Sequence, residues 1–64
     1  NEETMKSVII INADASPIRM GFTISAEALQ PVLNWYFGFH SGDTITVQID
    51  GVYVETDENG DIIG

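Results

Sequence analysis

Residues 57–61 contain oxygen-bearing side chains at alternating positions, as the first ligands of a calcium loop do. These side chains belong to Asp57, Asn59 and Asp61, and carboxylate and amide oxygens are the donors that calcium prefers. The glycine that such a loop needs at its sixth position would fall on Ile62. The pattern therefore predicts a turn in this segment, and we expect no metal site.

Residues 40–43 contain the residue types of a hydrolase triad, in His40, Ser41 and Asp43. Neighbours in sequence rarely bring nucleophile, base and orienting group into line. His40 is better placed to cap the carboxyl end of a helix, where positive charge is favourable. The chain shows no cofactor motif, and 64 residues leave little volume for a water-excluding pocket. We therefore expect neither catalysis nor a bound cofactor.

The charge balance is strongly acidic. Ten carboxylate side chains face only Lys6 and Arg19, which gives a formal net charge of -8. Binding to nucleic acid or anionic lipid depends largely on lysine and arginine. The composition therefore argues against direct nucleic-acid binding and favours a protein partner with a basic surface.

The acidic side chains near the end of the chain form one candidate binding surface. Its members are Asp50, Glu55, Asp57, Glu58 and Asp61. One interpretation is solvation, because charged residues keep small proteins soluble and protect sheet edges. The other is recognition, in which carboxylates occupy a basic groove built for nucleic-acid phosphates.

The aromatic side chains of a predicted helix form a second candidate surface. At 100° per residue the apolar side chains of this helix cover an arc of roughly 200°, whereas packing on a core needs about 100°. The centre of the arc, predicted to be interior, comprises Leu29, Val32, Leu33 and Tyr36. Trp35 and Phe39 on one flank and Phe37 on the other are predicted to reach beyond the core and contact a partner. The alternative is that a small domain uses these rings to fill its interior.

The elements that position these residues follow from periodicity and turn chemistry. Residues 7–12 include four successive β-branched aliphatics, typical of a strand covered on both faces. Residues 18–24 alternate at period two and predict a second strand, joined to the first as an antiparallel hairpin. Ser25 suits a helix N-cap, but Pro31 means that the helix either kinks there or begins near Gln30. Gly42 is a plausible helix stop.

Residues 43–56 give the clearest local signal. Alternating aliphatics flank Asp50 and Gly51, which predicts a two-residue hairpin with a type I′ turn. The order strand, strand, helix, strand, strand predicts an α+β fold, with one helix packed on one face of a four-stranded, mostly antiparallel sheet. We expect a flexible amino terminus over residues 1–6, a single domain over 7–56, and an acidic turn or loose tail over 57–64.

These observations lead to two functional hypotheses. The preferred one is a small acidic inhibitor or adaptor that occupies the nucleic-acid-binding surface of a basic target. In kind it resembles the compact, acidic, cysteine-free proteins with which phages and mobile elements block host nucleic-acid enzymes. The alternative is a structural unit that associates with copies of itself into a homodimer or larger homo-oligomer. The lack of cysteine and of a long apolar run predicts a cytoplasmic protein without membrane contact.

Overall fold

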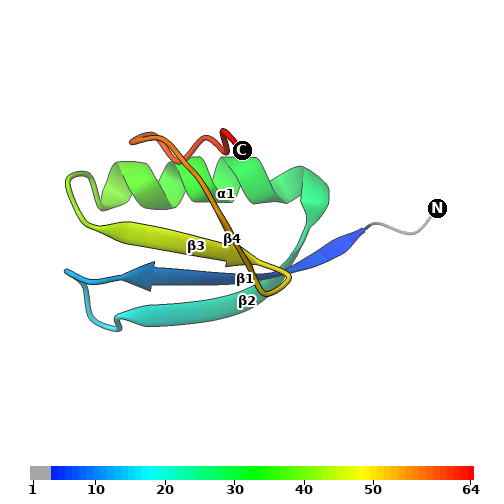
Figure 1. The fold of residues 1–64 in the computed structure, drawn as a ribbon, viewed down its shortest axis with the longest axis horizontal. Helices are drawn as coiled ribbons and strands as arrows, with labels where there is room; N and C mark the ends of the chain where they lie inside the picture. Colours follow the sequence, from blue (N-terminus) through cyan, green and yellow to red (C-terminus); the bar gives the residue numbers. More distant parts are fainter. Residues whose placement is uncertain (1–3) are drawn as a thin grey trace.

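The structure is a computed structural model, and it describes residues 4–64. Its elements in chain order are β1 (Met5–Asn12), β2 (Arg19–Ser25), α1 (Ala26–Phe39), β3 (Ile45–Ile49) and β4 (Val52–Val54). The four strands form one antiparallel sheet in the order β2-β1-β3-β4, and α1 packs on one face of it (Figure 1). The predicted α+β fold with its ββαββ order is confirmed.

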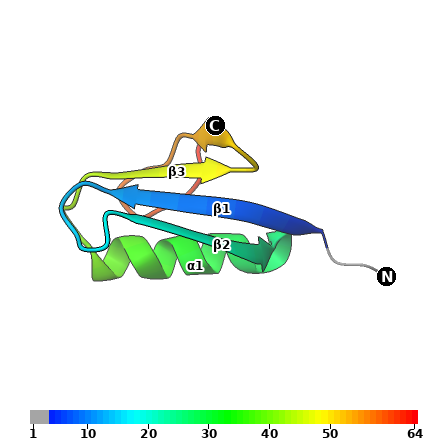
Figure 2. The same cartoon turned by 90° about the horizontal axis from the view of Figure 1, so that it is seen from below.

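The helix connects two strands, β2 and β3, that are not neighbours in the sheet. β1 pairs antiparallel with both β2 and β3, so β2 and β3 run in the same direction on either side of it. α1 joins these two strands and runs back against the direction of β2 (Figure 2). The carboxyl end of α1 therefore lies at the same end of the molecule as the start of β2 and β3.

β1 supplies the centre of the core, but only on one face. Val8, Ile10 and Val47 are almost fully buried beneath α1. The other face of β1 carries Ile9 and Ile11, which are only half-buried. The prediction that this strand is covered on both faces is wrong, because the single helix covers one face of the sheet.

The amino-terminal boundary differs from the predicted one. β1 begins at Met5, and Lys6 pairs with Ile24 in the ladder to β2. Part of the segment predicted to be flexible is therefore strand. Residues 1–3, on which the rest of that prediction falls, lie outside the described residues.

The helix begins where Ser25 predicts it. The Ser25 Oγ accepts a hydrogen bond from the Ala28 backbone N–H at 3.3 Å, as an N-cap residue does. α1 continues through Pro31, so the alternative start near Gln30 is wrong. At its other end the His40 N–H donates to the Tyr36 carbonyl at 2.9 Å, and His40 is the C-cap residue. The chain then turns through Gly42 at a φ of 89°.

The second hairpin matches its prediction in turn type and register. Asp50 and Gly51 have φ values of 52° and 82°, and two successive positive φ angles define the type I′ turn. Ile49 pairs with Val52, and Val47 pairs with Val54. This register places both pairs on the face that packs against the helix.

Candidate functional site

The segment that follows β4, residues 55–63, folds back and docks on α1. We call it the C-terminal segment. Thr56 and Ile62 form an antiparallel bridge, which confirms the turn predicted for this segment and excludes a loose tail for these residues. The side-chain amide of Gln30, on α1, forms two hydrogen bonds to this segment. The Gln30 Nε2 donates to the Gly60 carbonyl at 2.7 Å, and the Gln30 Oε1 accepts from the Ile62 N–H at 3.1 Å.

Asn34 lies one turn after Gln30 on the same face of α1, and its side-chain amide also binds the C-terminal segment. The Asn34 Nδ2 donates to the Asn59 carbonyl and to the Asp61 Oδ1, both at 2.7 Å. Gly60 is buried against the helix between these contacts, with a φ of 86°. The polar face of α1 that carries Gln30 and Asn34 is therefore a contact surface within the protein.

The C-terminal segment overturns one predicted contact residue. Phe37 is only 7 % exposed and belongs to the core cluster. The prediction that Phe37 projects from the helix flank is wrong, because it assumed that only the sheet packs against α1. Gly60 packs against Leu33 and Phe37 and closes that flank.

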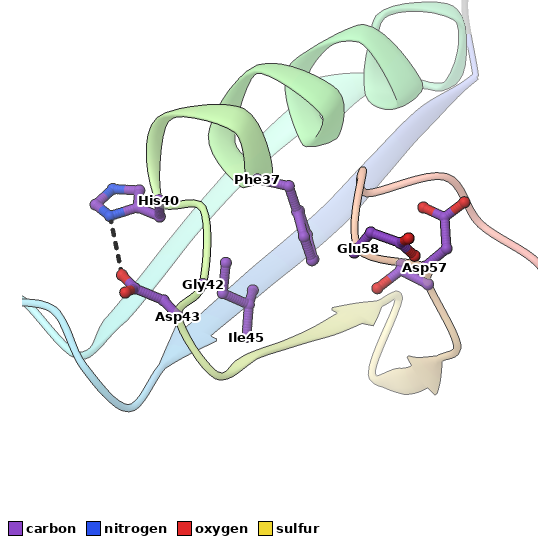
Figure 3. Close-up of a pocket in the computed structure, with 8 residues that line it drawn as sticks. Phe37, His40, Gly42, Asp43, Ile45, Asp57 and Glu58 are labelled. Atoms are coloured by element: carbon purple, nitrogen blue, oxygen red, sulfur yellow. Dashed lines mark ion pairs between the residues drawn. The ribbon is translucent and has the colours of Figure 1, made fainter.

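A groove of about 290 Å³ lies between the carboxyl end of α1 and the C-terminal segment (Figure 3). Its lining residues are Phe37, His40, Gly42, Asp43, Ile45, Thr56, Asp57 and Glu58. Figure 3 shows Phe37 and Ile45 between two polar groups, His40 with Asp43 on one side and Asp57 with Glu58 on the other. The groove thus combines an apolar middle with carboxylates at both ends. It brings together two of the predicted contact residues, Asp57 and Glu58, beside the buried Phe37.

All five aspartates of the chain accept hydrogen bonds that hold turns or loops in place. The Asp57 Oδ1 accepts from the N–H groups of Asn59 and Asp61, each at 2.9 Å. The Asp14 Oδ2 accepts from the Thr44 N–H at 2.8 Å. The remaining acceptors are Asp43, Asp50 and Asp61. Only Asp57 bonds to nearby backbone N–H groups, as aspartate often does in turns; the other four join segments that are distant in the sequence.

The glutamates behave differently. The side chains of Glu27, Glu55 and Glu58 are exposed and form neither a hydrogen bond nor an ion pair with any other residue in 4–64. Glu58 lines the groove, and Glu55 is the residue before Thr56, which also lines it. Of the predicted acidic contact residues, these two keep their whole carboxylate available to a partner.

Asp50 is held at the base of the β3–β4 turn. Its Oδ1 accepts from the Ser7 N–H at 3.0 Å, and its Oδ2 lies 3.4 Å from the Lys6 Nζ. The Ser7 N–H is the main reason that the pKa of Asp50 lies below the ordinary 3.8; partial desolvation opposes this, and Lys6 adds to the lowering. This contact gives Asp50 a role in joining β1 to the hairpin.

We expect the Asp50 carboxyl carbon, followed by NMR against pH, to titrate with a midpoint below 3.8. Because the pKa is lower in the folded state, the contact stabilises the fold above pH 3.8 and its contribution is lost as the pH falls through the folded pKa. Lys6→Met should raise the midpoint only part of the way, since the Ser7 N–H remains. A wild-type midpoint at or above 3.8 would contradict this assignment.

Trp35 and Phe39 lie on the flank of α1 that faces away from the C-terminal segment. Their side chains are 64 % and 73 % exposed, and the two rings stack with centroids 5.9 Å apart and an interplanar angle of 10°. The exposure predicted for these two residues is confirmed. Neither ring lines the groove, although Phe39 packs edge-to-face on the groove residue His40 with ring centroids 5.0 Å apart.

Sequence reasoning missed most of the groove. His40, Asp43 and Thr56 come from the α1–β3 loop and from the segment after β4, and only the folding back of residues 55–63 brings them together. The one sequence feature that indicated this folding back is the pair of amide side chains Gln30 and Asn34 on the predicted helix. Two hydrogen-bonding side chains one turn apart on a helix are suited to hold another segment.

Two further properties of the described part of the chain bear on function. No helix within residues 4–64 combines the length and the apolar character needed to cross a membrane. In the same residues, no three His, Cys, Asp or Glu side chains are grouped so that they could hold a metal ion. Comparison with protein-family models, curated proteins and solved structures gave no match.

Proposed function

We propose that this protein is a small acidic protein-binding module, an inhibitor or adaptor that binds the basic surface of a nucleic-acid-binding protein. A source in a phage or mobile element and a cytoplasmic location fit the same proposal. The observation that carries it is the groove at the carboxyl end of α1, where an apolar middle lies between carboxylates. That arrangement complements one particular kind of side chain.

Lysine and arginine side chains have an apolar stem and a charged head. In the groove, the stem would pack on Phe37 and Ile45, and the head would lie near Glu58 or Asp57. An arginine suits the site best, because its planar guanidinium can donate two hydrogen bonds to one carboxylate. Basic surfaces that bind nucleic acid are rich in such side chains.

The net charge of -8 supports the same partner. A strongly acidic surface accelerates the encounter with a basic protein, and it repels nucleic acid that competes for that surface. Lys6 is paired with Asp50, so one of only two cationic side chains is already partly neutralised within the chain. The protein therefore presents a negative potential to its surroundings.

We propose binding without catalysis. The His40 Nδ1 lies 3.3 Å from the Asp43 Oδ2, which provides a base and an orienting carboxylate. Among residues 4–64, however, the Ser41 hydroxyl forms no hydrogen bond to His40. The nucleophile that a triad needs is not in contact with its base.

An oligoarginine peptide tests the groove directly, with affinity measured by isothermal titration calorimetry. Glu58→Gln should weaken binding about threefold to fivefold, the range expected for one exposed ion pair. The affinity should also fall as salt rises from about 50 to about 500 mM, because the Debye length shortens about threefold. Asp57 is unsuitable for this test, because its carboxylate also holds the turn.

Glu27→Gln is the matched control. Glu27 is also exposed and bonds to nothing else in residues 4–64, but it lies in the first turn of α1, at the far end of the helix from the groove. Its replacement removes the same charge and should leave the affinity almost unchanged. Equal losses in the two variants would show that the peptide responds to net charge alone, and the groove would then have no specific role.

A further inference from the structure

A second surface, along β2, has the properties of an open sheet edge. Two backbone bonds determine which groups face outward: Asn12 N–H to the Ile18 carbonyl at 2.7 Å, and Ala26 N–H to the Thr4 carbonyl at 2.8 Å. Hydrogen-bonded pairs alternate along an antiparallel ladder, so Met20, Phe22 and Ile24 direct their backbone groups to β1. Arg19, Gly21 and Thr23 therefore direct theirs away from the sheet.

The two edges of the sheet are protected very differently. β4 has only three residues, and the chain after it returns through the Thr56–Ile62 bridge. β2 has seven residues, contains no proline, and carries a single charge, on Arg19. Natural proteins protect exposed edges with short strands, prolines or several charges. β2 lacks these protections.

Exposed apolar side chains accompany this edge on the helix side of the sheet. Ile18 and Met20 are 58 % and 37 % exposed, and the pairing of Met20 with buried Ile10 places it on the face that α1 covers. Trp35 and Phe39 lie on the flank of α1 opposite the C-terminal segment, and α1 packs against β2 and β1 (Figure 2). The exposed apolar side chains of the edge and those of the aromatic flank therefore lie on the same side of the sheet.

The distribution of charge favours a second copy of the chain at this surface. β2 contains no carboxylate. Glu55, Asp57 and Glu58 belong to the C-terminal segment, which follows β4 at the opposite edge of the sheet and folds back beside α1 (Figure 1). Two chains of charge -8 repel one another. The repulsion is weakest along β2 itself, because the acidic residues nearest to it in sequence, Asp14 and Glu27, lie outside the strand, one before it and one after it. Salt screens the repulsion that remains.

We propose that β2 pairs antiparallel with β2 of a second copy, around a twofold axis at Gly21. Arg19, Gly21 and Thr23 of one copy would then exchange backbone hydrogen bonds with Thr23, Gly21 and Arg19 of the other. Ser25 is excluded from this ladder, because as the N-cap its carbonyl already accepts the first bond of α1. The two sheets become one continuous sheet, and no polar edge remains on this side.

The aromatic side chains fit the space that such a pairing creates. With α1 above β1 in each copy, three strand spacings separate the two helices by about 14 Å, whereas directly packed helices lie about 8–10 Å apart. Gly21 is about 13 Å along β2 from Ser25, and α1 covers that distance in about nine residues. Trp35 is therefore level with the twofold axis, where large rings from both copies fill the gap.

Sedimentation velocity of the full chain over the micromolar range tests the proposal. We expect a dimer whose dissociation constant rises at least about tenfold in Trp35→Ala. Tyr53→Ala is the matched control, since Tyr53 is 63 % exposed and Trp35 is 64 % exposed, and Tyr53 lies on β4 at the other edge. It should leave the dimer unchanged. A wild-type chain that remains monomeric, or equal effects of the two substitutions, would overturn the proposal.

Thr23→Pro tests the strand pairing itself. It removes an outward N–H and leaves the bonds to β1 intact, so the dimer should be lost while the circular dichroism spectrum is kept. A folded Thr23→Pro chain that still dimerises would show that the edge is not the contact. The dimer should strengthen with salt, whereas binding of the oligoarginine peptide should weaken, so the two proposals can fail independently.

Discussion

Gly60→Ala is expected to destabilise the protein by about 3 kcal/mol, from the sum of backbone strain and overpacking. An added Cβ would lie 2.7 Å from the Leu33 carbonyl oxygen and 2.9 Å from the Phe37 Cδ1. The first contact is with helix backbone, which cannot move aside, and the φ of 86° is itself unfavourable for alanine. A domain of this size has a total stability of about 3–10 kcal/mol, so the loss is a large fraction of it.

Urea unfolding measures this loss, and two other glycines provide matched controls. Gly42 and Gly51 have φ values of 89° and 82°, and nothing lies within 4 Å of an added Cβ at either. Alanine at these positions introduces the strain without the clash and should cost about 1 kcal/mol. Equal destabilisation in all three variants would mean that the C-terminal segment does not press on α1.

Asn12→Ala is expected to destabilise the protein by about 2–4 kcal/mol, because it removes three hydrogen bonds at a fully buried position. The Asn12 Nδ2 donates to the Asp43 Oδ2 at 3.1 Å and to the Tyr36 Oη at 3.3 Å. Its Oδ1 accepts from the Asp14 N–H at 2.9 Å. One side chain thus joins the end of β1, the helix and the α1–β3 loop, and its loss leaves several polar groups without partners.

Tyr36→Phe is the control for this prediction. It removes only one of the three bonds and nearly preserves the side-chain volume, so it should cost about 1 kcal/mol in the same urea experiment. Asn12→Ala should also weaken binding of the oligoarginine peptide, because Asp43 lines the groove. If Asn12→Ala costs no more than Tyr36→Phe, the three contacts do not act as a connected network.

The fold was predictable because each of its signals is local. The type I′ turn needs only Asp50 and Gly51 between alternating aliphatics, and Ser25 defines the start of α1 within one turn. Pro31 gave a conflicting local signal. Tertiary packing decided the outcome, since Leu29 and Leu33 on both sides of it are buried in the core.

The site was less predictable because it depends on contacts between distant segments. The helical pattern shows how much of α1 is apolar, but it does not show that Gly60 covers Phe37. Charge counting gives every carboxylate the same weight. The structure distinguishes them by side-chain length: the aspartates hold turns, and Glu55 and Glu58 remain available. Only the Asp57 turn follows from local turn chemistry; the partners of the other aspartates lie in distant segments of the chain, so the sequence does not show them.

The central claim is that a basic side chain binds in the groove between α1 and the C-terminal segment. The most direct test is an NMR titration of the isotope-labelled protein with the oligoarginine peptide, following every backbone amide. We predict that the largest shift changes occur at residues that line the groove, in 40–45 and 56–58, and that Glu58→Gln reduces them. Changes that are equally large at Glu27 and along β2 would contradict the claim, because the peptide would then be responding to the overall charge of the protein.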